Sequence, residues 1–201
     1  MSIRLKIASL WLPDFILKRE LDNVAKNTIE GLNGALKRCT PWRLDEVIEQ
    51  DEVLKGSAEE RTSIMANAHN RRVKVLIEEF GYKEAVKIGR KSMFEVGFQL
   101  GQKARQRLGV GNNFKDLKLA AKIMYKVLGI DFKIENRDEK NVMVVNRCAL
   151  SKYYIPEACV VLSAADEGVI RGLNQNMKME FKERITDGAS ECLACISEVK
   201  V

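Results

Sequence analysis

The hydrophobic period of the chain changes near residue 130, and this change constrains the fold more than any other feature. Before it, apolar residues recur at helical spacing, as Phe94 and Phe98 do, which places them on one face of a helix. From Ile130 onward, Ile130, Phe132 and Ile134 alternate with charged residues, which is typical of a strand with one face in water. The sequence therefore predicts helices first and a sheet afterwards.

The helical part carries recognisable start and stop signals. Residues 57–60 (Ser-Ala-Glu-Glu) form a capping box, and Thr40-Pro41 and Gly81 mark interruptions. Helices are predicted over residues 14–38, 41–54, 58–79, 83–108 and 114–128.

One predicted helix is unusually rich in glycine. Gly89, Gly97 and Gly101 all lie within residues 83–108, and each costs ~1 kcal/mol relative to alanine in a helix interior. We expect these positions to allow the close approach of another backbone.

The second part of the chain reads as two hairpins separated by a helix. Strands are predicted over 130–135, 141–146, 177–181 and 191–199, with turns at 136–140 and 186–190 and a helix over 156–172. The predicted fold class is α+β, with N-terminal helices followed by a ββαββ antiparallel sheet that helices cover on one face. We expect residues 1–80 to form a helical extension and residues 81–201 an α+β domain, packed as one globular unit.

Composition and charge exclude several classes of protein. The net charge is +6, but basic residues are spread along the chain and alternate with acidic ones, unlike the concentrated stripe of a nucleic-acid-binding protein. No run approaches the ~18 apolar residues of a membrane span. The start of the chain shows no cleavage site of a secretory signal. We therefore expect a cytoplasmic protein that binds neither nucleic acid nor membrane.

Five cysteines are present, and in a cytoplasmic protein we expect them to be reduced thiols. Cys192 and Cys195 form a C-x-x-C pair, but both lie in a predicted strand, where residues three apart point to opposite faces. No second close pair exists. A zinc or iron–sulfur site made of Cys148, Cys159 and Cys192 is kept as an alternative.

The helix predicted from Pro156 carries the best candidate site. Cys159, Ser163 and Asp166 are spaced i, i+4, i+7 and share one face. A carboxylate on an apolar wall is either a hydrogen-bond anchor or a working acid or base. The helix N-terminus is expected to lower the thiol pKa of Cys159. The alternative is that the cysteines are plain core residues and that Asp166 is solvated.

His69 is the single histidine of the chain. It lies on a predicted helix beside charged residues, which favours a surface group over a catalytic one. A catalytic cysteine–histidine pair in this chain would therefore have to include His69.

Several of these motifs together resemble the L-2-amino-thiazoline-4-carboxylic acid hydrolase family. They are Asn146-Arg-Cys148-Ala-Leu, Pro156-Glu-Ala-Cys159, Asp166 and Asp187-Gly-Ala-Ser-Glu-Cys192. The resemblance covers roughly residues 80 to 201, with Ala149 where the family commonly has proline and Ala194 where it usually has an aromatic residue. The order of elements also resembles vinyl-reductase-type hydrocarbon-binding domains, which implies the ligand-binding fold of nitric-oxide sensors and Golgi tethering subunits.

The resemblance implies a hydrolase that opens a small sulfur- or nitrogen-containing carboxylated ring or amide. In this interpretation Cys159 is the nucleophile or a substrate anchor, and Asp166 is the acid/base or orienting group. Substrate would contact Cys148, Cys192 and Ser163, with Arg147 as the cation for a carboxylate. The alternative function is a non-catalytic module that binds a hydrophobic small molecule or a metal. The N-terminal helices are expected to pack in a homodimer.

Overall fold

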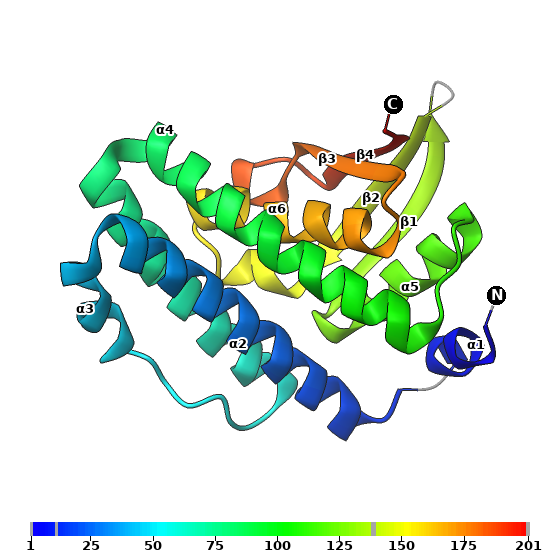
Figure 1. The fold of residues 1–201 in the computed structure, drawn as a ribbon, viewed down its shortest axis with the longest axis horizontal. Coiled ribbons are helices and arrows are strands. Elements are labelled where there is room, and N and C mark those ends of the chain that lie inside the picture. The colour runs from blue at the N-terminus through cyan, green and yellow to red at the C-terminus, as the bar shows by residue number, and fades with distance from the viewer. Residues whose placement is uncertain (1, 11, 138–139, 200–201) are drawn as a thin grey trace.

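The computed structural model describes residues 2–10, 12–137 and 140–199, shown in Figure 1. The helices are α1 (Ile3–Leu10), α2 (Asp14–Cys39), α3 (Leu44–Ile48), α4 (Ala58–Leu108), α5 (Phe114–Val127) and α6 (Pro156–Leu173). The strands are β1 (Ile130–Arg137), β2 (Lys140–Cys148), β3 (Met177–Glu183) and β4 (Cys192–Glu198). Short 3-10 turns are η1 (Pro41–Arg43), η2 (Ala149–Lys152) and η3 (Ile185–Asp187).

The four strands form one antiparallel sheet in the order β1-β2-β4-β3, which confirms the predicted α+β class. On one face, alternate residues of the two central strands are buried: Met143 and Val145 of β2, and Cys192, Ala194 and Ile196 of β4. These residues belong to the main hydrophobic core, to which α5 and α6 also contribute. The helices therefore cover the sheet as the alternating pattern predicted.

Helices α4 and α6 run side by side and touch backbone to backbone (Figure 1). A Cβ added at Gly97 would stand 1.9 Å from the carbonyl oxygen of Ala165, and one at Gly101 would stand 2.4 Å from that of Val169. The contact is reciprocal, because a Cβ at Gly168 would stand 2.2 Å from the carbonyl oxygen of Phe94. The close approach predicted from the glycines is confirmed, with α6 as the partner.

The signals at the start and in the middle of α4 are also confirmed. Ser57 Oγ accepts a hydrogen bond from the Glu60 backbone N–H at 3.2 Å, and the Glu60 carboxylate accepts one from the Ser57 N–H at 2.7 Å. Gly81 has φ 70° and ψ 164°, so a kink there divides α4 into two helical parts.

One helix ends earlier than predicted. The helix expected to reach Leu54 stops at Ile48, and the chain then continues without regular structure toward α4. Asp51 on this segment pairs with Arg72 of α4, with 2.5 Å between Asp51 Oδ2 and Arg72 Nη2. Because the Arg72 side chain is fully buried, it needs this carboxylate as a partner. The prediction that this helix continues to residue 54 is therefore wrong.

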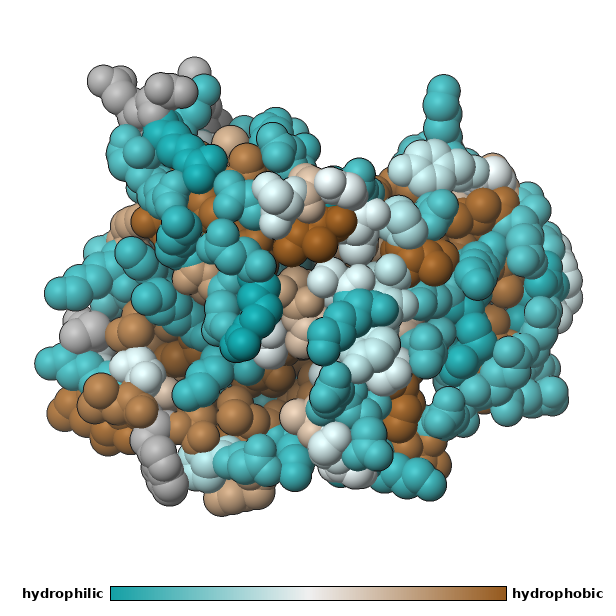
Figure 2. All heavy atoms as spheres, turned by 180° about the vertical axis from the view of Figure 1, so that it is seen from behind, coloured by the Kyte–Doolittle hydropathy of each residue, from teal (hydrophilic) through white to brown (hydrophobic). Residues whose placement is uncertain are grey.

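The N-terminal helix α1 was not predicted, and it exposes apolar side chains. Ile3, Ile7 and Leu10 are exposed, and in Figure 2 hydrophobic side chains gather at the lower left, the side on which α1 lies. None of the described helices is long and apolar enough to cross a membrane. The turn predicted at 136–140 includes residues 138–139, which lie outside the described residues.

The α4–α6 contact predicts opposite effects for two glycine-to-alanine substitutions. We expect Gly97→Ala to lower the free energy of unfolding by about 1–3 kcal/mol or more, because the new Cβ overlaps a rigid backbone carbonyl. Gly34→Ala in α2 is the control. There the nearest atom is the flexible end of Arg38 at 3.4 Å, so the better helix propensity of alanine should stabilise the fold by up to about 1 kcal/mol. Urea denaturation measures both, and equal effects would contradict the packing argument.

Candidate functional site

A pocket lies between the inner face of the sheet and helices α2, α4, α5 and α6. Its volume is about 90 Å³, somewhat less than the ~150 Å³ of an engineered cavity that holds benzene. The polar and thiol side chains that line it are Thr28, His69, Tyr125, Cys148, Tyr154, Cys159, Ser163, Asp166, Arg184 and Cys192. The rest of the lining is apolar, with Val24, Met65, Leu128, Ile130, Val145, Leu150, Leu162, Ala165 and Phe181.

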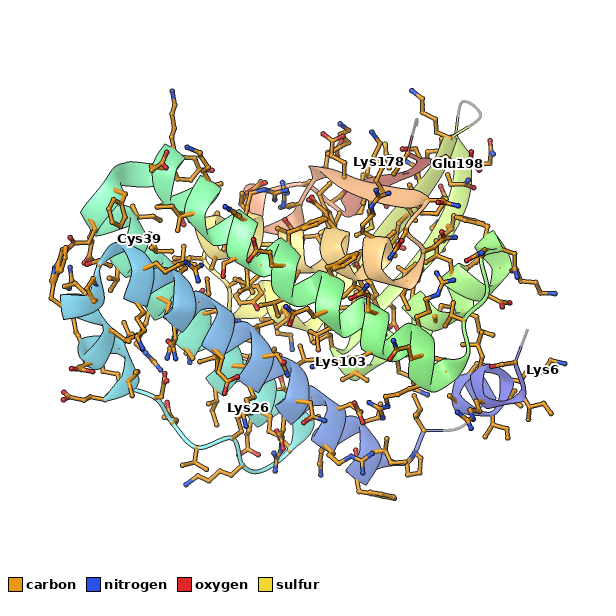
Figure 3. All side chains as sticks on the ribbon, in the orientation of Figure 1. Lys6, Lys26, Cys39, Lys103, Lys178 and Glu198 are labelled. Atoms are coloured by element: carbon orange, nitrogen blue, oxygen red, sulfur yellow. The ribbon has the colours of Figure 1, made fainter. Side chains whose placement is uncertain are left out.

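Three cysteines converge in this pocket from three elements. Cys148 is the last residue of β2, Cys159 lies in the second turn of α6, and Cys192 is the first residue of β4. Cys195 is on the opposite face of β4, as its alternate position requires. Figure 3 shows Cys39 at the end of α2, away from the sheet.

The predicted face of α6 is turned into the pocket. Cys159, Ser163 and Asp166 all line it, because positions i, i+4 and i+7 lie above one another along the helix. The structure thus brings together the α6 residues and the two strand cysteines that the sequence singled out.

Burial controls the protonation of the pocket thiols. It raises the pKa of Cys159 to about 11 and that of Cys148 to about 12, and it also raises the pKa of Cys192. The expectation that the helix N-terminus lowers the pKa of Cys159 is therefore wrong. The apolar surroundings disfavour the thiolate because they remove its solvation, and the helix N-terminus does not compensate for this loss.

Asp166 is the acidic group of the pocket. Burial raises its pKa from 3.8 to about 7, and the neighbouring Glu167 adds to the rise. Tyr125 acts in the opposite direction, yet its hydroxyl oxygen makes no hydrogen bond among the described residues. It is therefore a near neighbour of the carboxyl group and not a bonded partner. A carboxyl group that titrates near neutral pH is suited to acid/base work.

The cation of the pocket is Arg184, which follows β3. Its Nη2 donates to Ser163 Oγ at 3.0 Å, and its guanidinium carbon lies 5.4 Å from the ring centroid of Phe181. Its Nε is buried and has no hydrogen-bond partner among the described residues. A buried donor without an acceptor is costly, so this group can take a further acceptor from a ligand.

Arg147, the cation proposed from the sequence, is not brought to the pocket. Its side chain is 79% exposed and pairs with Asp131 at 2.6 Å. Arg147 immediately precedes Cys148 on β2, and neighbouring strand residues point to opposite faces. Because Cys148 points into the pocket, the side chain of its neighbour Arg147 points away from it.

His69 is buried, with 1% of its surface exposed, which corrects the expected surface position. Its Nδ1 lies 2.8 Å from the Tyr154 hydroxyl and its Nε2 lies 2.9 Å from Thr28 Oγ1. Burial, together with the charge of Arg72, lowers the pKa of His69 to about 3. Neither Tyr154 nor Thr28 was singled out by the sequence, and no local pattern marks them.

The described part of the chain gives no support to the alternative of a metal site made of Cys148, Cys159 and Cys192. Among residues 2–10, 12–137 and 140–199, no group of three or more His, Cys, Asp or Glu side chains is placed to hold a metal ion.

A family model for L-2-amino-thiazoline-4-carboxylic acid hydrolase matches residues 61–196 of this sequence. The chain belongs to this family, as the motifs around Cys148, Cys159, Asp166 and Cys192 predicted. The match begins earlier than residue 80, so it includes the part of α4 that carries His69. No curated protein matches the chain.

The solved structures that resemble this chain include the following two. The first is a trafficking protein particle complex subunit 3 from Naegleria fowleri, covalently bound to palmitic acid, with a TM-score of 0.56 and 18% identity over 69% of this chain and 95% of that one. The second is an H-NOX protein from S. oneidensis in the Fe(II)NO ligation state, with a TM-score of 0.46 and 14% identity over 87% and 99%. The first similarity confirms the fold class.

The raised pKa of Asp166 predicts a specific dependence of stability on pH. The folded protein keeps this proton up to about pH 7, while the unfolded chain releases it near 3.8. Stability contributed by Asp166 is therefore fully present below about pH 4 and is lost as the pH rises to about 7.

We expect Asp166→Asn to be more stable than the wild type above pH 7, by up to a few kcal/mol, since one pKa unit corresponds to about 1.4 kcal/mol. The difference should shrink as the pH falls toward 4. Thermal melts from pH 4 to 8 measure it, with Asp131→Asn at an exposed carboxylate as control. A difference that does not vary with pH would contradict the raised pKa of Asp166.

Proposed function

We propose that this chain is a hydrolase that opens a small carboxylated ring containing sulfur and nitrogen, with Asp166 as the acid/base group. The family membership supports the class of reaction. The observation that carries the proposal is a carboxyl group with a pKa of about 7 in a mostly apolar pocket, which is also lined by a cation with a buried donor that has no acceptor among the described residues. The chemistry of Asp166 and the binding by Arg184 are separate parts of the proposal.

Asp166 supplies both proton transfers of such a hydrolysis. As a carboxylate it accepts a proton from water while the water oxygen bonds to the ring carbon between nitrogen and sulfur, and the C=N π electrons move to the nitrogen. The lone pair of that nitrogen then re-forms the C=N bond while the carbon–sulfur bond breaks. The electron pair of the broken bond goes to the leaving sulfur, which takes the proton from Asp166. The net change is the addition of one water, and Asp166 returns to its starting state.

The small cavity and its cation favour a compact anionic substrate. About 90 Å³ is well below the roughly 300–1,000 Å³ of pockets for drug-sized ligands. Among the described residues that line the pocket, Arg184 carries the permanent positive charge. Its unpartnered Nε can donate to a ring carboxylate. Ser163, three residues before Asp166 on α6, holds Arg184 one helical turn from the acid/base group.

The cysteines take a contact role in this proposal. With pKa values of about 11 and 12, Cys159 and Cys148 are neutral thiols at physiological pH, and a neutral thiol is a weak nucleophile. They supply polarisable walls for a sulfur-containing ring. Cys159 thus acts as a substrate anchor, one of the two roles that the sequence left open.

We expect Asp166→Asn to lower kcat/KM for 2-amino-thiazoline-4-carboxylic acid by at least about 100-fold, because the amide cannot accept the proton from water. Wild-type kcat/KM should rise about tenfold per pH unit up to about pH 7 and then level off. Loss of the ring is followed by liquid chromatography. Cys159→Ala should retain more activity than Asp166→Asn. The reverse order, in folded variants, would assign the chemistry to the thiol.

The two arginines give a matched pair for carboxylate binding. We expect Arg184→Gln to raise KM about 10- to 100-fold, the effect of losing a hydrogen bond to a charged group, while Arg147→Gln leaves KM unchanged because Arg147 points to solvent. Arg184→Lys should restore only part of the binding, since an ammonium lacks the planar fork of donors. Initial rates against substrate concentration measure all three, and an effect of Arg147→Gln alone would contradict the assignment.

A non-catalytic binding module is the second candidate, and the mostly apolar lining of the pocket favours it. In that case apolar small molecules should raise the melting temperature of the wild type, and no ring compound should be consumed. Turnover that depends on Asp166 would exclude this alternative.

A further inference from the structure

Three side chains in the wall of the pocket form a hydrogen-bonded series. Tyr154, His69 of α4 and Thr28 of α2 all line the pocket, and hydrogen bonds link them in that order. The contacts are 2.8 Å from the Tyr154 hydroxyl to His69 Nδ1 and 2.9 Å from His69 Nε2 to Thr28 Oγ1. His69 and Thr28 are both buried, so each polar atom must find its partner within the protein.

Thr28 determines which atom donates and which accepts in each of these hydrogen bonds. Its hydroxyl lies 2.8 Å from the carbonyl oxygen of Val24 and 3.1 Å from that of Ala25. Carbonyl oxygens only accept, so the single Thr28 proton is directed to the backbone. Thr28 Oγ1 is then an acceptor toward His69, and Nε2 must carry the imidazole proton.

The neutral imidazole of His69 then determines that the Tyr154 hydroxyl is the donor in their hydrogen bond. Burial keeps His69 in its neutral form, with a pKa of about 3, so only one ring nitrogen carries a proton. With the proton on Nε2, Nδ1 is an acceptor and the Tyr154 hydroxyl donates to it. The hydroxyl proton is thereby occupied, and the phenolic oxygen has only lone pairs left for the pocket.

The backbone on both sides of Tyr154 is held by one side chain. The Asn70 side-chain amide donates to the Tyr153 carbonyl oxygen at 2.7 Å and accepts from the Ile155 N–H at 3.3 Å. Asn70 follows His69 directly on α4, so one helical turn positions both the hydroxyl and the loop that carries it. Tyr154 is therefore a preorganised acceptor.

We propose that the Tyr154 hydroxyl oxygen selects a substrate that bears an N–H donor, such as an amino or amidine group on the ring. The proposal rests on the proposed function for the ring itself. Arg184 offers only donors to the pocket and Tyr154 only an acceptor, so the two residues orient a ligand with a carboxylate at one end and an N–H group at the other. Tyr154 is a specificity-determining residue in this scheme, while His69 and Thr28 position its proton.

The single histidine makes the direction of the hydrogen-bonded series measurable without any substrate. In protein with ¹⁵N-labelled histidine, we expect one imidazole with Nε2 protonated, Nδ1 unprotonated and no titration between pH 8 and 5. Tyr154→Phe should shift the Nδ1 resonance, because it loses its donor, and Thr28→Val should populate the Nδ1–H tautomer. A protonated Nδ1 or a titration near pH 6.5 in the wild type would overturn the proposal.

Two ring compounds test the ligand partner. Wild type should bind 2-amino-thiazoline-4-carboxylic acid about 10-fold or more tightly than the 2-methyl analogue, since the methyl group leaves the Tyr154 oxygen unpaired. Asp166→Asn is used as the background, so that turnover does not disturb calorimetry, and Tyr154→Phe in that background should bring the ratio near one. An unchanged ratio, with melting temperatures matched, rules out Tyr154 as the selector. Binding of neither ring contradicts the proposed function and the assigned ligand, while the histidine spectrum still decides the direction of the hydrogen-bonded series.

Discussion

The backbone contact between α4 and α6 is the constraint on which the pocket depends. Gly97 of α4 and Gly168 of α6 bring the two helices to a separation at which a single added Cβ would overlap a carbonyl group. With one side of α6 fixed in this way, its other side is turned toward the sheet, where Cys159, Ser163 and Asp166 line the pocket. Glycine is unfavourable in a helix interior, and the packing of two backbones offsets that cost.

Burial then sets the chemistry of the residues that this packing encloses. It disfavours every charged form that lacks a partner, so Cys148 and Cys159 remain thiols, His69 remains neutral and the pKa of Asp166 moves to about 7. Asp166 is the group whose two forms interconvert close to neutral pH. The same desolvation that makes it a usable base lowers the stability of the fold when it ionises.

Donors and acceptors are separated around the pocket. The guanidinium of Arg184 carries donors only, and one of them is buried without an acceptor among the residues that the structure describes. In the proposed scheme the Tyr154 oxygen is an acceptor for the ligand, because its proton is directed to His69. A ligand with a carboxylate and an N–H group matches both, and such a ligand places its ring beside Asp166 and the thiols. The proposed substrate class and the proposed selectivity follow from one distribution of charge.

The sequence by itself determined the order of elements, the sheet, the close helix contact and the α6 face with Cys159, Ser163 and Asp166, because these depend on periodicity and residue size within one segment. It also marked Cys148 and Cys192 through motifs. Only the tertiary structure decided that Arg184 replaces Arg147 at the pocket, that burial raises the thiol pKa, and that His69 meets Tyr154, 85 residues away along the chain. Contacts between distant segments and the loss of solvent arise when helices and sheet close on each other, and no local spacing records them.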